Sequence, residues 1–231
     1  ATIIKSVVES LGGVSYDIYV DNGAPTVAGT TLLTQSASVD YKPNTQDVDA
    51  CLLTSKASVT FIVRDQAERD LFTPLIEAQE LQYRLRIHRN DSLWWVGFVL
   101  LNFVEEDFGQ YPYSITLGAT DGISRLKEID YDQGDSEDFI PVGDHIFKIL
   151  EQVPLSDYYT ANEEYARFHS TLFPEGLTPS ASLDLHQSVR ASFKALRTVD
   201  ERWIVKFKTC YEALISLLEN VGARLMYAQG R

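Results

Sequence analysis

The chain has 231 residues with 45% hydrophobic and 23% charged side chains, a composition typical of a folded protein of one large or two modest domains. Its formal net charge of -13 argues against a surface built to grip nucleic acid, because such a surface needs a basic patch. No apolar run is long enough to span a membrane, since the longest, around Leu93–Val104, is interrupted by Gly97 and Asn102. The N-terminal residues lack the basic-then-apolar layout of a signal peptide.

The N-terminal part of the chain predicts β-strands. Ile3–Val8 and Val14–Val20 are strand candidates, and the alternation in Ala57–Val63 predicts a third strand with one buried face. Residues 26–38 are rich in Thr, Ser and Gly, which favours an extended loop or weak strands, and residues 42–49 form a polar loop.

A helix is predicted after the third strand. Asp65 stands where a helix cap is expected, with the carboxylate of Glu68 three residues on. Leu71 and Leu75 belong to an apolar stripe with helical spacing, but Pro74 lies inside it, so we expect a separate short helix at the start.

Arg84, Arg86 and Arg89 form a small basic cluster, and Arg84 and Arg86 lie on one face of the next predicted strand, residues 81–88. The cluster fits either ion pairs across a subunit interface or ordinary cross-strand pairs within the chain. Asn90-Asp91 then predicts a hairpin turn into the following strand.

Residues 92–120 carry the most informative pattern. Trp94, Trp95 and Phe98 lie in a strand that is apolar on both faces, so it is buried on both sides or buries one side against a neighbouring subunit. Strict alternation predicts that the two tryptophans point to opposite faces. Tyr113–Thr120 alternates and predicts a strand with one wet face, and Asp121-Gly122 then turns the chain into a short apolar segment that ends at Ile129.

The pattern becomes more helical in the second part of the chain. The acidic residues 132–138 indicate a linker, and we place it at 132–142. Asp144 is a candidate cap for a helix that ends before Pro154, 162–168 is a candidate short helix, and Thr209–Val221 has a strong amphipathic stripe. Residues 223–228 then read as a strand that opens a hairpin. Either the chain is an N-terminal fragment, or this strand pairs elsewhere in the same chain.

The order of these elements resembles a family of tail-tip or baseplate-hub tail proteins from phages and prophages of the Bacteroidetes. The resemblance rests on Leu93–Val99, Tyr113–Thr116, Ala119–Gly122 with Leu126–Ile129, and the C-terminal segment Cys210–Leu225 with Gln229–Arg231. It implies an α+β fold, in which residues 1–131 form a β-sandwich or barrel like that of tail tubes, with one helix. A mixed, more helical domain at 143–231 would follow and continue beyond the chain.

The sequence carries no convincing catalytic motif, so we expect no enzyme activity, no cofactor and no metal site. The four histidines are scattered, and Cys51 and Cys210 have neither metal nor redox spacing, which favours buried free thiols in a reducing compartment. One alternative is a carbohydrate-binding or glycan-processing accessory domain. Its basis is the run Glu105-Glu106-Asp107, which we expect next to Trp94, Trp95 and Tyr111, because sugar sites combine acids with aromatic rings.

The resemblance implies a structural component of the phage tail tip, assembled in the bacterial cytoplasm and carried in the virion. Such a hub forms a trimeric or hexameric ring, joins the tail tube to the spike or fibres, and contacts DNA only in passage through its lumen. The hub of a phage-like contractile injection system is a further alternative. The residues expected to serve packing or interfaces are Trp94, Trp95, Phe98, Tyr113, Arg84 and Arg86, with Asp121 and Gly122 fixing the turn.

Overall fold

The structure is a computed structural model that describes residues 2–10, 12–22, 29–43, 51–79, 81–106, 110–131, 139–153, 169–170, 190–192, 197–199, 205–220 and 223–226. The fold is mixed α+β and is dominated by one large, mostly antiparallel sheet. The described residues fall into two compact units: those within 1–42 and 55–121 form unit 1, and those within 43–54 and 122–226 form unit 2. The chain thus passes between units at Asp121, before the predicted boundary at Tyr131, and the predicted linker residues 132–138 lie outside the described residues.

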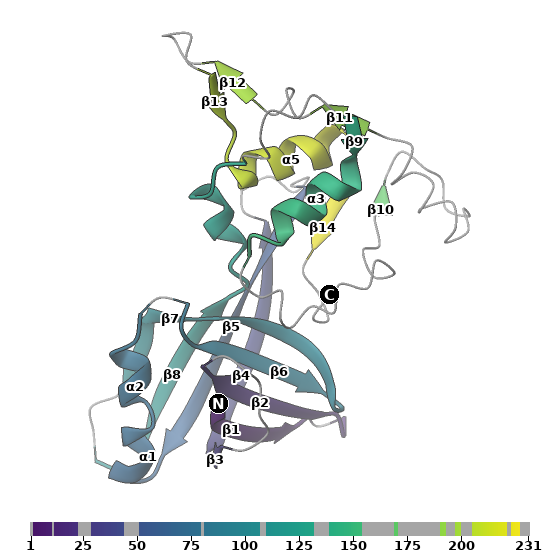
Figure 1. The fold of residues 1–231 in the computed structure, drawn as a ribbon. Helices are drawn as coiled ribbons and strands as arrows, with labels where there is room; N and C mark the ends of the chain where they lie inside the picture. Colours follow the sequence, from purple (N-terminus) through teal and green to yellow (C-terminus); the bar gives the residue numbers. More distant parts are fainter. Residues whose placement is uncertain are drawn as a thin grey trace. The chain divides into compact units, whose positions relative to one another are not determined.

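Unit 1 is a single coiled sheet with the strand order β4-β5-β8-β7-β6-β2-β1-β3 (Figure 1). The ladders from β5 through β8, β7, β6 and β2 to β1 are antiparallel, whereas β3 runs parallel to β1. Its strands are β1 (Thr2–Glu9), β2 (Ser15–Asp21), β3 (Thr30–Thr31), β4 (Leu33–Pro43), β5 (Leu52–Val63, in unit 1 from Ser55), β6 (Arg84–Arg89), β7 (Ser92–Glu106) and β8 (Tyr113–Thr120).

The core of unit 1 follows the alternation of the sequence. On β5, Val59, Phe61 and Val63 are fully buried, and on the neighbouring β8 the fully buried residues are Ile115 and Leu117. Val59 pairs with Leu117 and Phe61 with Ile115, so these side chains share one face of the sheet. The predicted strands at 57–63 and 113–120 are confirmed.

The β6–β7 hairpin also forms where the sequence predicts it. Asn90 and Asp91 have φ angles of 47° and 63°, the left-handed conformation that both central residues of a tight type I′ turn require. Asn and Asp tolerate this conformation better than other non-glycine residues.

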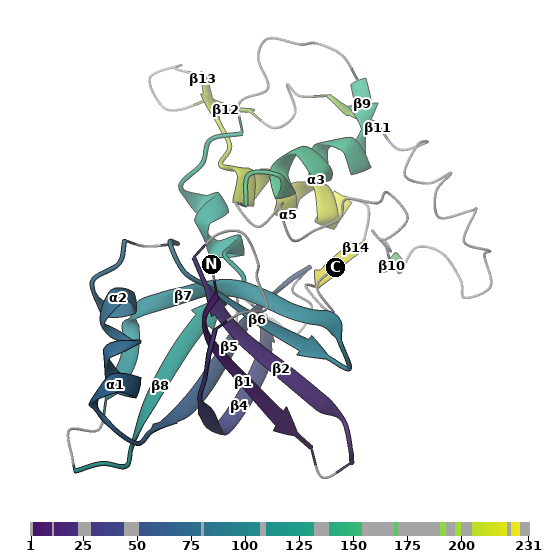
Figure 2. The same cartoon turned by 60° about the horizontal axis from the view of Figure 1, so that its bottom comes forward.

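One continuous segment links the two ends of the sheet (Figure 2). β3 pairs with β1, and only Leu32 separates it from β4, which pairs with β5. Leu32 is buried, its N–H donates to the Lys5 carbonyl at 2.9 Å, and its carbonyl accepts from the Ser6 hydroxyl at 2.7 Å. The rest of β4 pairs with no strand other than β5 among the described residues, so the sheet is closed at one end and open along a seam.

Two short helices follow β5, as the proline in the sequence predicts. The Asp65 carboxylate accepts from the Glu68 N–H at 2.9 Å and caps α1 (Gln66–Asp70). Pro74 lies in the first turn of α2 (Thr73–Ile76), where its missing N–H costs nothing. Phe72 packs on Phe61 with 5.8 Å between the ring centroids, which anchors the helices to the core.

Both faces of β7 are buried, as its apolar pattern predicts. Trp95, Val96, Phe98 and Val99 are all at most 3% exposed. Gly97 lies among them because a side chain has no room there: a Cβ atom would collide with the Trp95 ring and with the Thr120 carbonyl oxygen.

The described part of unit 2 contains two longer helices and several short strands. The predicted helix at 209–221 is α5 (Cys210–Asn220), opened by a reciprocal capping box in which Thr209 and Glu212 each accept from the backbone N–H of the other. Asp144 lies in the first turn of α3, not at its cap. The other elements are η1 (Ile123–Lys127), β9 (Phe139–Pro141), α3 (Val142–Leu150), β10 (His169–Ser170), β11 (Arg190–Ser192), β12 (Arg197–Val199), β13 (Val205–Phe207) and β14 (Ala223–Met226).

The C-terminal strand does pair within the chain. β14 runs parallel to the first residues of β5, with Leu225 opposite Leu52, and antiparallel to β10. The expectation that this strand pairs elsewhere in the same chain is therefore confirmed.

We predict that Gly97→Ala destabilises unit 1 by about 1–3 kcal/mol or more. The added methyl group would collide with the Trp95 ring and with the main-chain carbonyl of Thr120, and a main-chain group cannot easily move aside. Urea unfolding followed by circular dichroism measures the loss. Gly12→Ala is the matched control, since a Cβ atom at Gly12 would meet only the Ser10 hydroxyl at 3.9 Å. Equal stability of the two variants would contradict this packing around Gly97.

Candidate functional site

A buried hydrogen-bonded cluster lies where β8 ends. The Asp121 carboxylate accepts from the Ser55 backbone N–H and, at 2.9 Å, from the Ser55 hydroxyl. The Asp121 N–H donates back to the Ser55 carbonyl at 3.2 Å, and the Trp95 indole N–H donates to the Ser55 hydroxyl oxygen at 3.0 Å. Gly122 then adopts a φ of 78°, which turns the chain out of the strand. The predicted turn residues thus also join β5, β7 and β8.

The cluster is structural in its chemistry. Ser55, Trp95 and Asp121 are at most 1% exposed, so the serine hydroxyl cannot meet a substrate. The hydroxyl donates to the carboxylate and accepts from the indole, which satisfies the buried polar groups. Burial, together with the negative charge of Asp121, raises the pKa of the Tyr41 hydroxyl on β4, so Tyr41 stays protonated near the cluster.

The two tryptophans differ from the predicted alternation. Ile87 pairs with Trp95 and His88 with Leu93, so Trp94 is the extra residue of a β-bulge. Because the bulge breaks the alternation, Trp94 lines the same cavity as Ile87, whose partner across the strands is Trp95. The expectation that the tryptophans point to opposite faces is therefore wrong. Trp94 is half-buried and meets the Tyr16 ring edge-on, with 5.8 Å between the ring centroids.

Arg86 forms an ion pair inside the chain. Its Nε lies 2.6 Å from the Asp21 carboxylate on β2, and both side chains are buried. The Arg86 guanidinium also lies over the Tyr19 ring, 5.0 Å from the centroid. Arg84 is half-buried on the same face, 6.0 Å from the centroid of the Phe98 ring. For Arg86 the structure gives the cross-strand pair, the second of the two readings left open by the sequence.

The remaining predicted packing residues occupy different surroundings. Phe98 is 1% exposed and has no surface left for a partner in the described chain. Tyr113 is half-buried and stacks on Tyr111, with 5.1 Å between the centroids. Tyr111 is 41% exposed, and its hydroxyl donates to the Gln66 side-chain oxygen at 2.9 Å. The structure therefore does not bring the six predicted residues together into one site.

The acidic run is separated from the tryptophans. Glu105 and Glu106 end β7, opposite Thr116 and Ile115 of β8, whereas Trp94 lies near its start. Because a strand advances about 3.3 Å per residue, Trp94 and Glu105 lie on the order of 30 Å apart along β7. Asp107 lies outside the described residues. The Tyr111–Tyr113 pair provides aromatic rings near this end of the hairpin.

Unit 2 holds a buried group of titratable side chains that the sequence did not single out. The Tyr131 hydroxyl lies 2.6 Å from His145 Nδ1, and Tyr131, His145 and Cys210 are each 1% exposed. Burial, with the charge of Asp130 as a smaller cause, raises the pKa of Cys210 to about 11, so its thiol stays protonated. Burial likewise raises the pKa of Tyr131. Cys210 is the buried thiol expected from the sequence, whereas Cys51 is half-buried.

The described residues contain no group of three or more His, Cys, Asp or Glu side chains placed to hold a metal ion. None of the helices in the described ranges is long and apolar enough to cross a membrane. No protein-family model matches the chain, and no curated protein matches it. The residues and their geometry therefore carry the functional argument.

We predict that Asp121→Ala costs about 1–3 kcal/mol of stability, because it leaves the buried Ser55 N–H without its carboxylate acceptor. Asp40→Ala, at an exposed position of β4, is the control and should change the unfolding midpoint little. The tryptophan emission spectrum, to which the buried Trp95 contributes, should shift toward that of a wetter indole in Asp121→Ala. An unchanged midpoint in urea would show that the cluster does not hold the strands.

We predict that Ellman's reagent labels Cys51 well before Cys210 in the folded chain at pH 8, because burial keeps the Cys210 thiol protonated and out of reach. Since the folded pKa is raised, the stabilising contribution is present below about pH 9 and falls as the pH rises toward about 11. Between about pH 9 and about pH 11, the free energy of unfolding should fall less in Cys210→Ala than in the wild type. Equal labelling rates for the two thiols would refute the placement of Cys210.

Proposed function

We propose that this chain is a structural component of a phage tail tip, a baseplate hub that forms a ring between the tail tube and the distal spike or fibres. The proposal rests on the resemblance carried by Leu93–Val99, Tyr113–Thr116 and the Asp121-Gly122 turn, and on one feature of the sheet. The same ring is the proposed function if the chain belongs to a phage-like contractile injection system.

The structural observation behind the proposal is the exposure of the long edge strand β4. It has 11 residues, yet none of the side chains described in it, Leu33 to Lys42, is buried, and Leu33 is 52% exposed. The other long strands of the sheet bury at least one face. A long exposed edge strand offers unpaired main-chain groups to another strand, so proteins usually cover one.

A neighbouring subunit is the covering that fits a hub. Adding a strand of one copy to β4 of the next makes a head-to-tail contact, and such contacts close into rings when the rotation permits. The net charge of -13 would let DNA pass through such a ring without adhering, because carboxylates repel phosphates. The other partners would be tail proteins, in the host cytoplasm during assembly and in the virion afterwards.

A carbohydrate-binding or glycan-processing accessory domain is the second candidate. One observation favours it: Tyr111 and Tyr113 form a stacked, partly exposed pair beside Gln66, and sugar rings stack on such platforms. A binding module of this kind should be monomeric, and soluble glycans should raise its unfolding temperature.

We predict that the purified chain forms a closed ring of three or six copies, seen as a discrete mass by multi-angle light scattering and as rings in negative stain. Leu33→Lys should weaken the assembly, because it places a charge beside the edge of β4. Ile76→Lys is the matched control, since Ile76 is 43% exposed but lies on α2.

A chain that stays monomeric and is protected by soluble glycans would favour the accessory domain over the hub. A ring that both lysine variants disrupt equally would exclude β4 as the contact. A ring lost only in Leu33→Lys would support the hub and locate its interface.

A further inference from the structure

Unit 1 contains a partly open cavity of about 270 Å³ at the seam of its sheet. One wall comes from β1, β2, β6 and β7, and the other comes from β4. The first wall contributes large apolar and aromatic side chains, and the second contributes small ones. The first wall consists chiefly of Val8, Tyr16, Ile18, Ile87 and Trp94.

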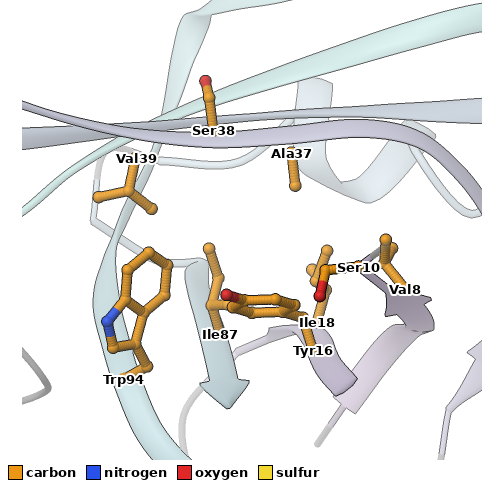
Figure 3. Close-up of a pocket in the computed structure, with 9 residues that line it drawn as sticks. All are labelled: Val8, Ser10, Tyr16, Ile18, Ala37, Ser38, Val39, Ile87 and Trp94. Carbon is orange, nitrogen blue, oxygen red and sulfur yellow. The ribbon is translucent and has the colours of Figure 1, made fainter. Parts of the chain in front are cut away.

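The two walls enclose a flat slot (Figure 3). The Tyr16 ring is seen nearly edge-on below Ala37, so one ring face is turned toward β4. The side chains of Ala37 and Val39 point into the slot from above, whereas the Ser38 side chain points away from it. Trp94 closes one side and holds the Tyr16 ring by the edge-on contact between them.

The lining selects the chemistry of a ligand. Among the residues that the structure describes, no charged side chain lines the slot, and the Ser10 hydroxyl already accepts from the Val14 N–H at 3.1 Å. A sugar would leave most of its hydroxyl groups without partners here, and an ion would lose its hydration without compensation. A planar ring loses nothing polar, and it can stack on Tyr16 while meeting the edge of Trp94.

We propose that unit 1 binds a small, neutral, planar aromatic molecule in this slot, between the Tyr16 ring and Ala37 of β4. The volume fits one or two rings, since a dry cavity of about 150 Å³ is enough for benzene. The assignment is separate from the hub function, because Leu33 is not among the residues that line the slot.

The test uses 4-fluorobenzyl alcohol and the full 231-residue chain, with binding followed by broadening of the fluorine resonance. We expect a dissociation constant on the order of 1 mM, as for a fragment of this size. Ala37→Phe fills the slot and should weaken binding at least about tenfold. Ser36→Phe adds the same ring one residue along, at an exposed position that does not line the slot, and should bind as the wild type does.

Cyclohexylmethanol carries the same alcohol on a puckered ring and should compete poorly. Leu33→Lys should keep the binding, which separates this site from the ring contact. If Ala37→Phe does not fold, Tyr16→Leu replaces it, because removal of the aromatic floor should also weaken binding.

Three results would overturn the proposal: unchanged binding in the slot variant, equal loss in Ser36→Phe, or equal competition by cyclohexylmethanol. Sedimentation of the same samples measures the oligomeric state and so tests whether a second copy of the chain occupies the slot. If a side chain of a second copy fills the slot, the wild type is a dimer that does not bind the fluorinated ring, and Ala37→Phe makes it a monomer. That outcome also rejects a small-molecule site.

Discussion

The buried carboxylate of Asp121 is the constraint on which unit 1 depends. It accepts from the backbone and the hydroxyl of Ser55, and the same hydroxyl accepts from Trp95. Three neighbouring strands, β8, β5 and β7, are thereby held in one register. Since a slip of one residue moves every side chain of a strand to the other face, one polar cluster protects the whole apolar pattern. The same cluster explains why residue 97 is a glycine, because the Trp95 ring that it holds occupies the space a side chain would need.

The position of Trp94 is a second consequence. With Trp95 fixed by its bond to Ser55, the bulge places the extra residue, Trp94, over the seam between the walls of the sheet. Its ring supports Tyr16, and the small side chains of β4 opposite them leave the slot open. A bulge is the usual means by which a sheet redirects a side chain near a binding site. Here it turns a strand that the sequence presents as pure core into one wall of a cavity.

Local chemistry made much of the fold predictable. The alternation of β8, the Asn90-Asp91 turn, the Asp65 cap and the break at Pro74 each depend on residues close together in sequence. The cluster and the slot depend on pairs far apart in the chain, such as Ser55 with Asp121 or Tyr16 with Trp94, and no local pattern marks such pairs. The bulge escaped prediction because it needs the register of two strands. Arg86 was recognisable as a partner for an acid, but its choice of Asp21 required the neighbouring strand.

β4 connects the two functional proposals and lets both hold at once. Beside the slot Ala37 faces inward while Ser38 faces away, and Ser36, Ser38 and Asp40 are exposed and small or polar. A strand added to β4 would therefore bind mainly through main-chain hydrogen bonds, which need no pocket on that face. The slot would remain behind the added strand, lined by the same inward side chains. A ring contact and a bound aromatic molecule would then stabilise the same strand from different sides, and each would reduce the cost of ordering β4 for the other.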